Sequence, residues 1–196
     1  HVTVRYAQRK DFGTFRDSAS VDHAEKSVEI VRQHGWLDPL PADEREAVIA
    51  AVKWHNKRDV PADLPPFTAR LAHLVRDADK LDIFRVLEDA VNGGALKEHP
   101  EIAWGLPVYE DPSARVVAAA RAGKPVEYSW IKTLADFVMI QVGWLNGGLH
   151  YLTVMRLAQK RHVLEFRRAF LKRLSDSPVI DQTCDEVRDR IAARLE

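Results

Sequence analysis

The sequence predicts an all-α protein, and three observations lead to this fold class. Apolar residues recur at helical spacing along most of the 196-residue chain. No segment shows the strict alternation of apolar and polar residues that marks a half-buried strand. Capping residues and glycines stand where the periodic segments would begin and end. Because 46% of the residues are hydrophobic, the chain can bury a sizeable core, and we expect one domain over residues 1–196.

The first two helices are predicted from the signals at their ends. In "SVDHAEKSVEIVRQHG", Ser20 or Asp22 serves as the N-cap and Gly35 ends the helix. In "ADEREAVIAAVKWHN", Asp43 is the expected N-cap, and acidic residues in the first turn suit the positive end of the helix dipole. The proline-rich segment 59–67 that follows is predicted to be a loop.

A long helix that carries three aspartates is expected from Thr68 to Val91. Because a helix advances about 100° per residue, spacing decides which side chains face the core. The predicted buried stripe is aliphatic and comprises Leu71, Leu74, Val75, Ala78, Leu81 and Val86. Asp82 falls near the middle of this stripe and Asp79 on its flank, whereas Asp77 falls on the solvent side. A buried carboxylate costs several kcal/mol unless it is paired or bound to a metal, so Asp79 and Asp82 need partners.

The remainder of the chain is also predicted to be helical. A short helix ends at Gly123, another spans about 126–145, and two or three more follow. The basic stretch 159–173 has an apolar helical stripe, which is typical of an amphipathic packing helix. The single domain therefore divides into a motif-bearing core over about 1–92 and C-terminal helices over about 111–196.

Two histidines face the predicted interior together with the two aspartates. His55 shares a helix face with Val52, and His23 lies in the first turn of its helix beside an apolar face. A lone inward histidine is more often a core residue than a ligand. Imidazole and carboxylate groups that converge from three helices, however, suit a divalent transition metal. His73 and Asp77 are four residues apart and form a second candidate pair, which faces solvent.

Three stretches resemble one known family. "HNKRDVP", "LVRDADKLDIFRV" and "FGTFRDSASVDHA" are similar to motifs of the HD-domain superfamily of metal-dependent phosphohydrolases, within a group of small bacterial HD proteins. The specific motifs cover roughly residues 1–90, and the similarity continues more weakly through "TLADFVMIQVGWLNG". The resemblance implies an HD-domain-like helical bundle in which the metal ligands come from separate helices.

The resemblance also implies roles for individual residues. His23 and His55 match histidine ligands of the family, Asp79 matches its late aspartate, and all three would hold metal. His1 matches the histidine of the family's His-Asp pair and would be a further ligand. Asp82 follows one turn after Asp79 and would position a helix or a ligand. Arg5 matches a basic position that faces phosphate, although a solvated surface arginine is an equal alternative.

The sequence departs from the family pattern at its start. Val2 stands where the metal-binding aspartate of the pair is expected, and Val4 stands where a glycine is expected. The family's upstream histidine has no counterpart. Either residues are missing from the start of the sequence, which the non-Met residue His1 favours, or the site is degenerate.

The ligand set indicates a reaction class. Histidines and carboxylates hold a cation that lowers the pKa of bound water and polarises a phosphoryl oxygen. We therefore expect a metal-dependent phosphohydrolase that acts on a small phosphorylated molecule, with a nucleotide favoured, and in which Asp79 and His55 are catalytic. The cation would be Mn, Fe, Ni, Zn or Mg. The alternative is a degenerate, non-catalytic HD module that binds a nucleotide or phosphate, or serves as a scaffold.

Composition limits the partners and the compartment. The formal net charge is zero, which argues against a general nucleic-acid binder. The single cysteine, Cys184, excludes an internal disulfide and suits a reducing compartment, so a cytoplasmic location is expected. No stretch approaches the ~18 apolar residues of a membrane span, and no signal peptide begins the sequence. A homo-oligomer is left open.

Overall fold

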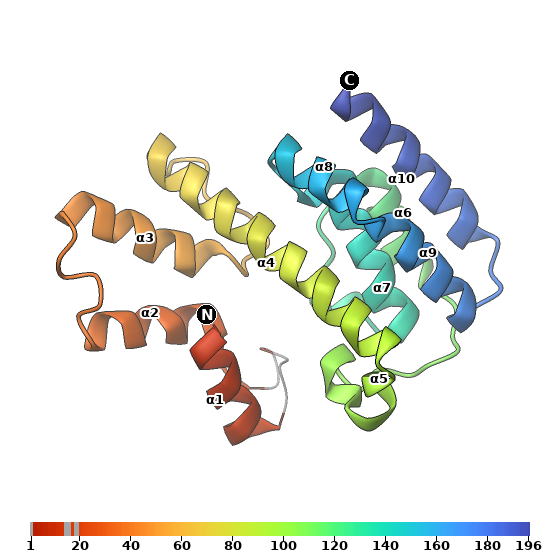
Figure 1. Ribbon diagram of the computed structural model, residues 1–196, viewed down its shortest axis with the longest axis horizontal. Coiled ribbons are helices and arrows are strands. Elements are labelled where there is room, and N and C mark those ends of the chain that lie inside the picture. The colour runs from red at the N-terminus through yellow and green to blue at the C-terminus, as the bar shows by residue number, and fades with distance from the viewer. Residues whose placement is uncertain (1, 14–16, 18–19) are drawn as a thin grey trace. The chain divides into compact units, whose positions relative to one another are not determined.

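The computed structural model describes residues 2–13, 17 and 20–196, and within them it contains helices and no strand (Figure 1). The predicted all-α fold class is thus confirmed. The α-helices are α1 Val2–Phe12, α2 His23–Gln33, α3 Ala42–Trp54, α4 Pro66–Asn92, α5 Ala95–Glu98, α6 Ala114–Ala122, α7 Leu134–Gly143, α8 Leu152–Lys160, α9 Val163–Leu174 and α10 Val179–Leu195. Short 3-10 helices, η2 Pro100–Ala103 and η3 Tyr128–Trp130, and a π-helix, η4 Trp144–Gly148, join them. Among the described helices, none combines the length and the apolar character needed to cross a membrane.

The helix ends agree with most of the sequence signals. Asp22 is the N-cap of α2, as one of the two alternatives predicted. At α3 the prediction was wrong, because Pro41 is the N-cap and Asp43 lies within the first turn. Proline at the N-cap supplies no side-chain acceptor, and α3 accordingly has no side-chain cap hydrogen bond. The expected 126–145 helix consists of η3 followed by α7, whose start is fixed by a capping box between Thr133 and Asp136.

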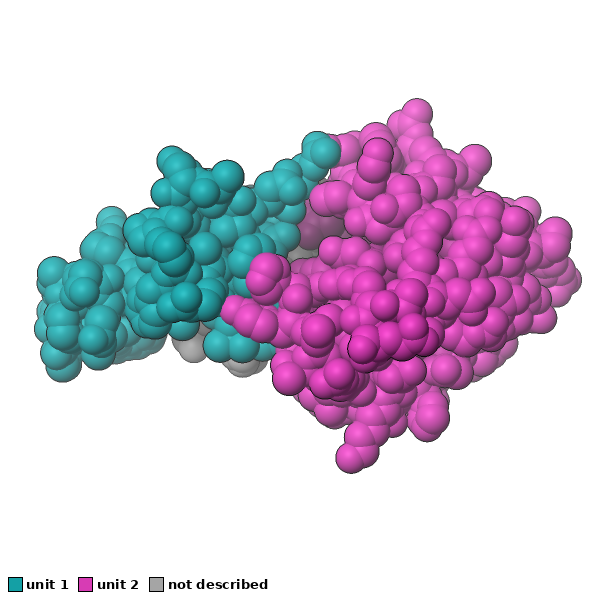
Figure 2. All heavy atoms as spheres, turned by 90° about the horizontal axis from the view of Figure 1, so that it is seen from above, with its two compact units in different colours: residues 1–79 teal, residues 80–196 magenta. Residues whose placement is uncertain are grey.

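The chain divides into two compact units, unit 1 over His1–Asp79 and unit 2 over Lys80–Glu196 (Figure 2). The boundary falls inside the 27-residue helix α4. Sequence reasoning had placed the motif-bearing core over 1–92 and the C-terminal helices over 111–196. The structural division comes earlier, because Phe84 and Leu87 in the second half of α4 belong to the apolar core of the C-terminal helices.

The buried face of α4 is the opposite of the predicted one. Asp77 is 1% exposed and Lys80 9%, whereas Leu74 is 51% exposed. Asp82, predicted to lie in the buried stripe, is an exposed side chain that accepts a hydrogen bond from Arg85 over 2.9 Å. The positions of the aliphatic residues predicted the wrong buried face. The buried face of this helix carries polar groups in unit 1, and it carries Phe84 and Leu87 in unit 2. The prediction that Asp77 faces solvent was therefore also wrong.

Unit 2 is built around α7, every residue of which is buried. Helices α6, α9 and α10 pack against α7 (Figure 1). Gly143 allows α6 to approach α7 closely, because a Cβ atom there would lie 2.9 Å from the Cα atom of Ala120 in α6. Unit 2 also buries one arginine. Arg167 of α9 is wholly buried and pairs with Glu88, and its guanidinium also donates to the Phe84 carbonyl.

Unit 1 has a small core with polar side chains at its centre. Among the residues of unit 1 whose side chains are described, four of the buried ones are alanines, namely Ala24, Ala47, Ala51 and Ala72. Alanine lets helices approach closely but contributes little apolar area. Gln8, His23, Ser27, His55 and Asp77 are buried among the same helices. Buried polar groups cost stability unless they are hydrogen-bonded, so such a centre is the informative feature of this unit.

Candidate metal centre

The site is built at the start of α2. The Asp22 side chain caps this helix, since its Oδ1 atom accepts from the backbone N–H groups of Ala24 at 3.0 Å and Glu25 at 3.3 Å. The cap fixes the first helical turn and with it the position of His23, the first residue of α2. His23 is 2% exposed, which confirms its predicted inward facing.

His55 approaches His23 from the end of α3. It directly follows Trp54, the last residue of that helix, and it is 5% exposed, as predicted from its helix face. The Nε2 atoms of His23 and His55 lie 2.9 Å apart. The two rings meet edge to face, with centroids 4.8 Å apart and an angle of 72° between their planes.

The partners of the two Nδ1 atoms decide where the ring protons lie. His55 Nδ1 is 2.5 Å from the backbone carbonyl of Val52. A carbonyl can only accept, so His55 Nδ1 carries a proton and donates it. His23 Nδ1 is 2.6 Å from Oδ2 of Asp17, and an ionised carboxylate likewise can only accept. Both Nδ1 atoms are therefore donors, and in neutral rings both Nε2 atoms are acceptors that face each other.

Two opposed acceptors need a positive species between them. A single shared proton satisfies both Nε2 atoms, and so does a metal cation. The observed separation of the Nε2 atoms, 2.9 Å, is a hydrogen-bond distance and places both nitrogens within reach of one cation. Ligating histidines also commonly donate their other ring N–H to a carboxylate or a backbone carbonyl, and Asp17 and Val52 supply these two acceptors.

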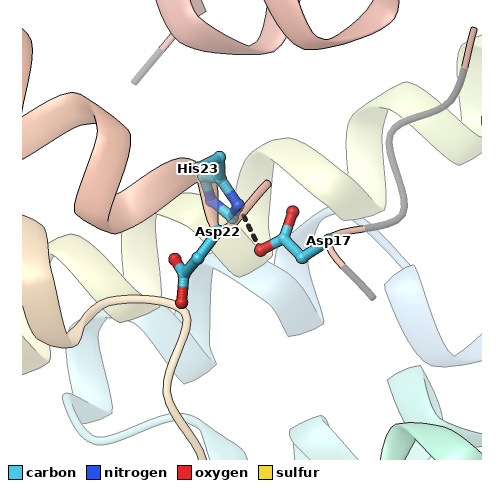
Figure 3. Close-up of side chains that lie close together, drawn as sticks. All are labelled: Asp17, Asp22 and His23. Carbon is cyan, nitrogen blue, oxygen red and sulfur yellow. Dashed lines mark hydrogen bonds and ion pairs between the residues drawn. The ribbon is translucent and has the colours of Figure 1, made fainter. Parts of the chain in front are cut away.

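Asp17, Asp22 and His23 form a candidate metal-binding group, with one potential ligand atom of each within 4.8 Å of the others (Figure 3). The carboxylate oxygens of this group already accept several hydrogen bonds. Asp17 accepts from Gln8 Nε2 at 3.0 Å and from Asn56 Nδ2 at 3.0 Å. The Asp17 carboxylate thus orients the His23 ring, and the Nε2 atoms of His23 and His55 are the ring atoms that could hold a cation.

Asp22 is equally engaged. Its Oδ1 atom accepts from Asn56 Nδ2 at 2.9 Å, and its Oδ2 atom accepts from Lys57 Nζ. Burial raises the pKa of the Asp22 carboxyl, but the hydrogen bonds from Lys57, Asn56 and the Glu25 amide outweigh burial and lower the pKa to about 2. The carboxylate is thus ionised near neutral pH and holds α2 to the turn that follows α3.

Of the residues proposed from the sequence, the structure brings His23 and His55 together. His1 lies outside the described residues. Arg5 lies in α1, but its side chain is outside the described part of the chain. Asp79 is half-buried on α4 and, among the described residues, is not a member of the group that Asp17, Asp22 and His23 form. Asp82 is exposed and paired with Arg85, and it is not buried as predicted.

Sequence reasoning missed Asp17, Gln8, Asn56 and Lys57. Asp17 and His23 both lie within the stretch "FRDSASVDHA", and Asn56 and Lys57 directly follow His55 in "HNK". Closeness in sequence to His23 and His55 was therefore the one signal that could have identified Asp17, Asn56 and Lys57. Helical spacing does not reveal Asp17, Asn56 and Lys57, because these residues lie outside the α-helices.

The chain matches no protein-family model, and neither the comparison with curated proteins nor that with solved structures finds a match. An interpretation of the site consequently depends on the geometry of its own residues. The main feature of that geometry is the pair of opposed Nε2 atoms. The Nδ1 atoms of the same two rings contact Asp17 and the Val52 carbonyl.

Proposed function

We propose that the chain is a metal-dependent phosphohydrolase of the HD type, acting on a small phosphorylated molecule such as a nucleotide. The observation that carries the proposal is the 2.9 Å approach of His23 Nε2 to His55 Nε2, with both Nδ1 atoms engaged as donors. Imidazole nitrogens suit Zn, Fe or Ni better than Mg, which prefers oxygen ligands. When bound, such a cation would supply Lewis acidity, which lowers the pKa of water and offsets negative charge on a phosphoryl oxygen.

Different residues of the chain would bind the cation, orient its ligands and contact the phosphate. His23 and His55 would hold the cation, and Asp17 would keep the His23 ring in the tautomer that presents Nε2. Lys57, whose side chain is 25% exposed and is paired with Asp22, would place a positive charge beside a bound phosphate. Arg5 is the further phosphate contact that the resemblance to HD proteins implies.

The hydrolase proposal is tested with metal-free protein reloaded with Zn²⁺ or Mn²⁺. Wild-type protein should hydrolyse a generic phosphomonoester or phosphodiester, and a strong chelator should abolish the activity. His55→Ala should reduce the rate to that of metal-free protein while the fold is retained. His34→Ala is the matched control, because His34 is exposed and stacks on Trp36. Equal activity in His55→Ala and wild type would rule out this site.

A second candidate is a non-catalytic HD module that holds a cation and a phosphate without hydrolysis. Two observations favour it. Val2 stands where the HD family has a metal-binding aspartate, and the Asp17 and Asp22 oxygens are engaged by N–H donors. The same preparation separates the two candidates, because the module would bind Zn²⁺ through His23 and His55 yet show no turnover with any phosphoester.

A further inference from the structure

The turn that presents His55 is held from two sides. On one side, three consecutive side chains reach the start of α2: His55 meets His23, Asn56 donates to Asp17 and Asp22, and Lys57 donates to Asp22. On the other side, the backbone carbonyls of the same turn accept from one guanidinium group. Arg76 Nη1 donates to the carbonyl of Trp54 at 2.9 Å and to that of Lys57, and Nη2 donates to the Arg58 carbonyl at 2.9 Å.

The Trp54 carbonyl needs a donor because α3 ends at this residue, and the Lys57 and Arg58 carbonyls lie in the turn beyond it. The last carbonyls of a helix have no partner within the helix, and they carry its partial negative charge. A cationic guanidinium donates hydrogen bonds to such carbonyls and also offsets their partial negative charge. Its planar fork also fixes the relative directions of the three carbonyls, which the single ammonium of a lysine cannot do.

We propose that Arg76 is a positioning residue of the metal centre, and that it holds the 55–58 turn so that His55 Nε2 faces His23 Nε2. Arg76 acts through the backbone carbonyls of the turn, which accept its hydrogen bonds. The inference rests on the proposed function in one respect, since it takes the two Nε2 atoms as the cation site. It also gives a role to the arginine that precedes Asp77 in "RDADKLD".

The test compares Arg76→Met and Arg76→Lys with the matched control Arg85→Met. Arg85 lies on the same helix and forms exposed ion pairs with Asp82 and Asp89. For each protein, the dissociation constant for Co²⁺ and the visible absorption spectrum of the Co²⁺ form are measured. The free energy of unfolding of the metal-free protein is measured in parallel and corrects the Co²⁺ affinity for any loss of folded protein.

Loss of groups that support a metal ligand typically weakens metal binding by about 10–100-fold. Arg76→Met should weaken Co²⁺ binding by at least about tenfold after the correction for folding, and should change the Co²⁺ spectrum, because the His55 ring is less well placed. Arg76→Lys should fall between Arg76→Met and wild type, since an ammonium can serve only some of the carbonyls. Arg85→Met should match wild type in both measurements.

The failures are distinguishable. If wild-type protein binds no Co²⁺, or if His55→Ala binds it as tightly as wild type does, the cation site itself is wrong. If wild type binds Co²⁺ through His55 but both Arg76 variants keep its affinity and spectrum, the positioning role is overturned and the cation site stands. A loss of unfolding free energy with an unchanged corrected affinity and spectrum would give Arg76 a structural role alone and would likewise overturn the inference.

Discussion

At the scale of single residues, the proton positions on two imidazole rings carry the argument. His55 Nδ1 faces a carbonyl and His23 Nδ1 faces a carboxylate, so the opposed Nε2 atoms require a proton or a cation between them. The inference needs only the donor and acceptor chemistry of the partners. The same chemistry gives the Asp17 carboxylate a role. It fixes the His23 tautomer while its oxygens also accept hydrogen bonds from protein donors.

Asp17→Asn tests the role of that carboxylate. The amide cannot stabilise the His23 N–H as strongly as an ionised carboxylate does, so metal affinity should fall by about 10–100-fold. Asp38→Asn is the control, because Asp38 is an exposed side chain paired with Arg45. The measurement is Zn²⁺ affinity by competition with a chromophoric chelator. An affinity for Asp17→Asn within twofold of wild type would remove Asp17 from the centre.

At the scale of helices, the capping of α2 links stability to pH. The Asp22 carboxyl has an ordinary pKa of 3.8 and a pKa of about 2 in the folded protein. Because the folded pKa is the lower one, ionised Asp22 stabilises the fold fully above about pH 4, and this contribution is lost as the pH falls through about 2.

Asp22→Asn keeps a capping side chain and removes the titrating group. Between pH 5 and pH 2, the free energy of unfolding should therefore fall more steeply for wild type than for the variant. Asp22→Ala, which also removes the cap, should be less stable than Asp22→Asn at neutral pH by about 1 kcal/mol. The measurement is urea unfolding at each pH, and parallel pH profiles for wild type and Asp22→Asn would contradict the low pKa.

The facing of α4 gives a second prediction at this scale. Asp77 is 1% exposed and engaged with other groups, whereas the Asp82 side chain is 59% exposed. Asp77→Ala should lower the free energy of unfolding by about 1–3 kcal/mol, because it leaves buried partner groups unsatisfied. Asp82→Ala should change it by no more than ~0.5 kcal/mol. Denaturant unfolding of both variants checks this, and the reverse order would restore the facing predicted from the sequence.

At the scale of the whole molecule, the two units use different kinds of interior. Unit 2 buries a continuous apolar core around α7, whose residues are all buried. Unit 1 buries Gln8, His23, His55 and Asp77 among small alanines, and hydrophobic patterning is a poor guide to such an interior. The inward facing of His23 and His55 could still be predicted, because each lies beside apolar residues of its own helix, whereas the burial of Asp77 could not.

The candidate site was predictable only in part, for a related physical reason. Facing can be calculated for residues on regular helices, and His23 and His55 lie at helix ends where the calculation still holds. Asp17 and Asn56 lie outside the α-helices, and their directions follow from tertiary hydrogen bonds that spacing does not encode. Arg76 was overlooked because its partners are backbone carbonyls, which are the same whatever the sequence of the turn.

The central claim, that the Nε2 atoms of His23 and His55 hold a divalent cation, is tested most directly by anomalous diffraction from crystals grown with Zn²⁺. We predict an anomalous peak bonded to both Nε2 atoms, about 2.0–2.1 Å from each, with Asp17 and the Val52 carbonyl still on the Nδ1 atoms. A map with no peak between the two rings, or with the peak on the carboxylates of Asp17 and Asp22 and no bond to His55, would contradict the claim.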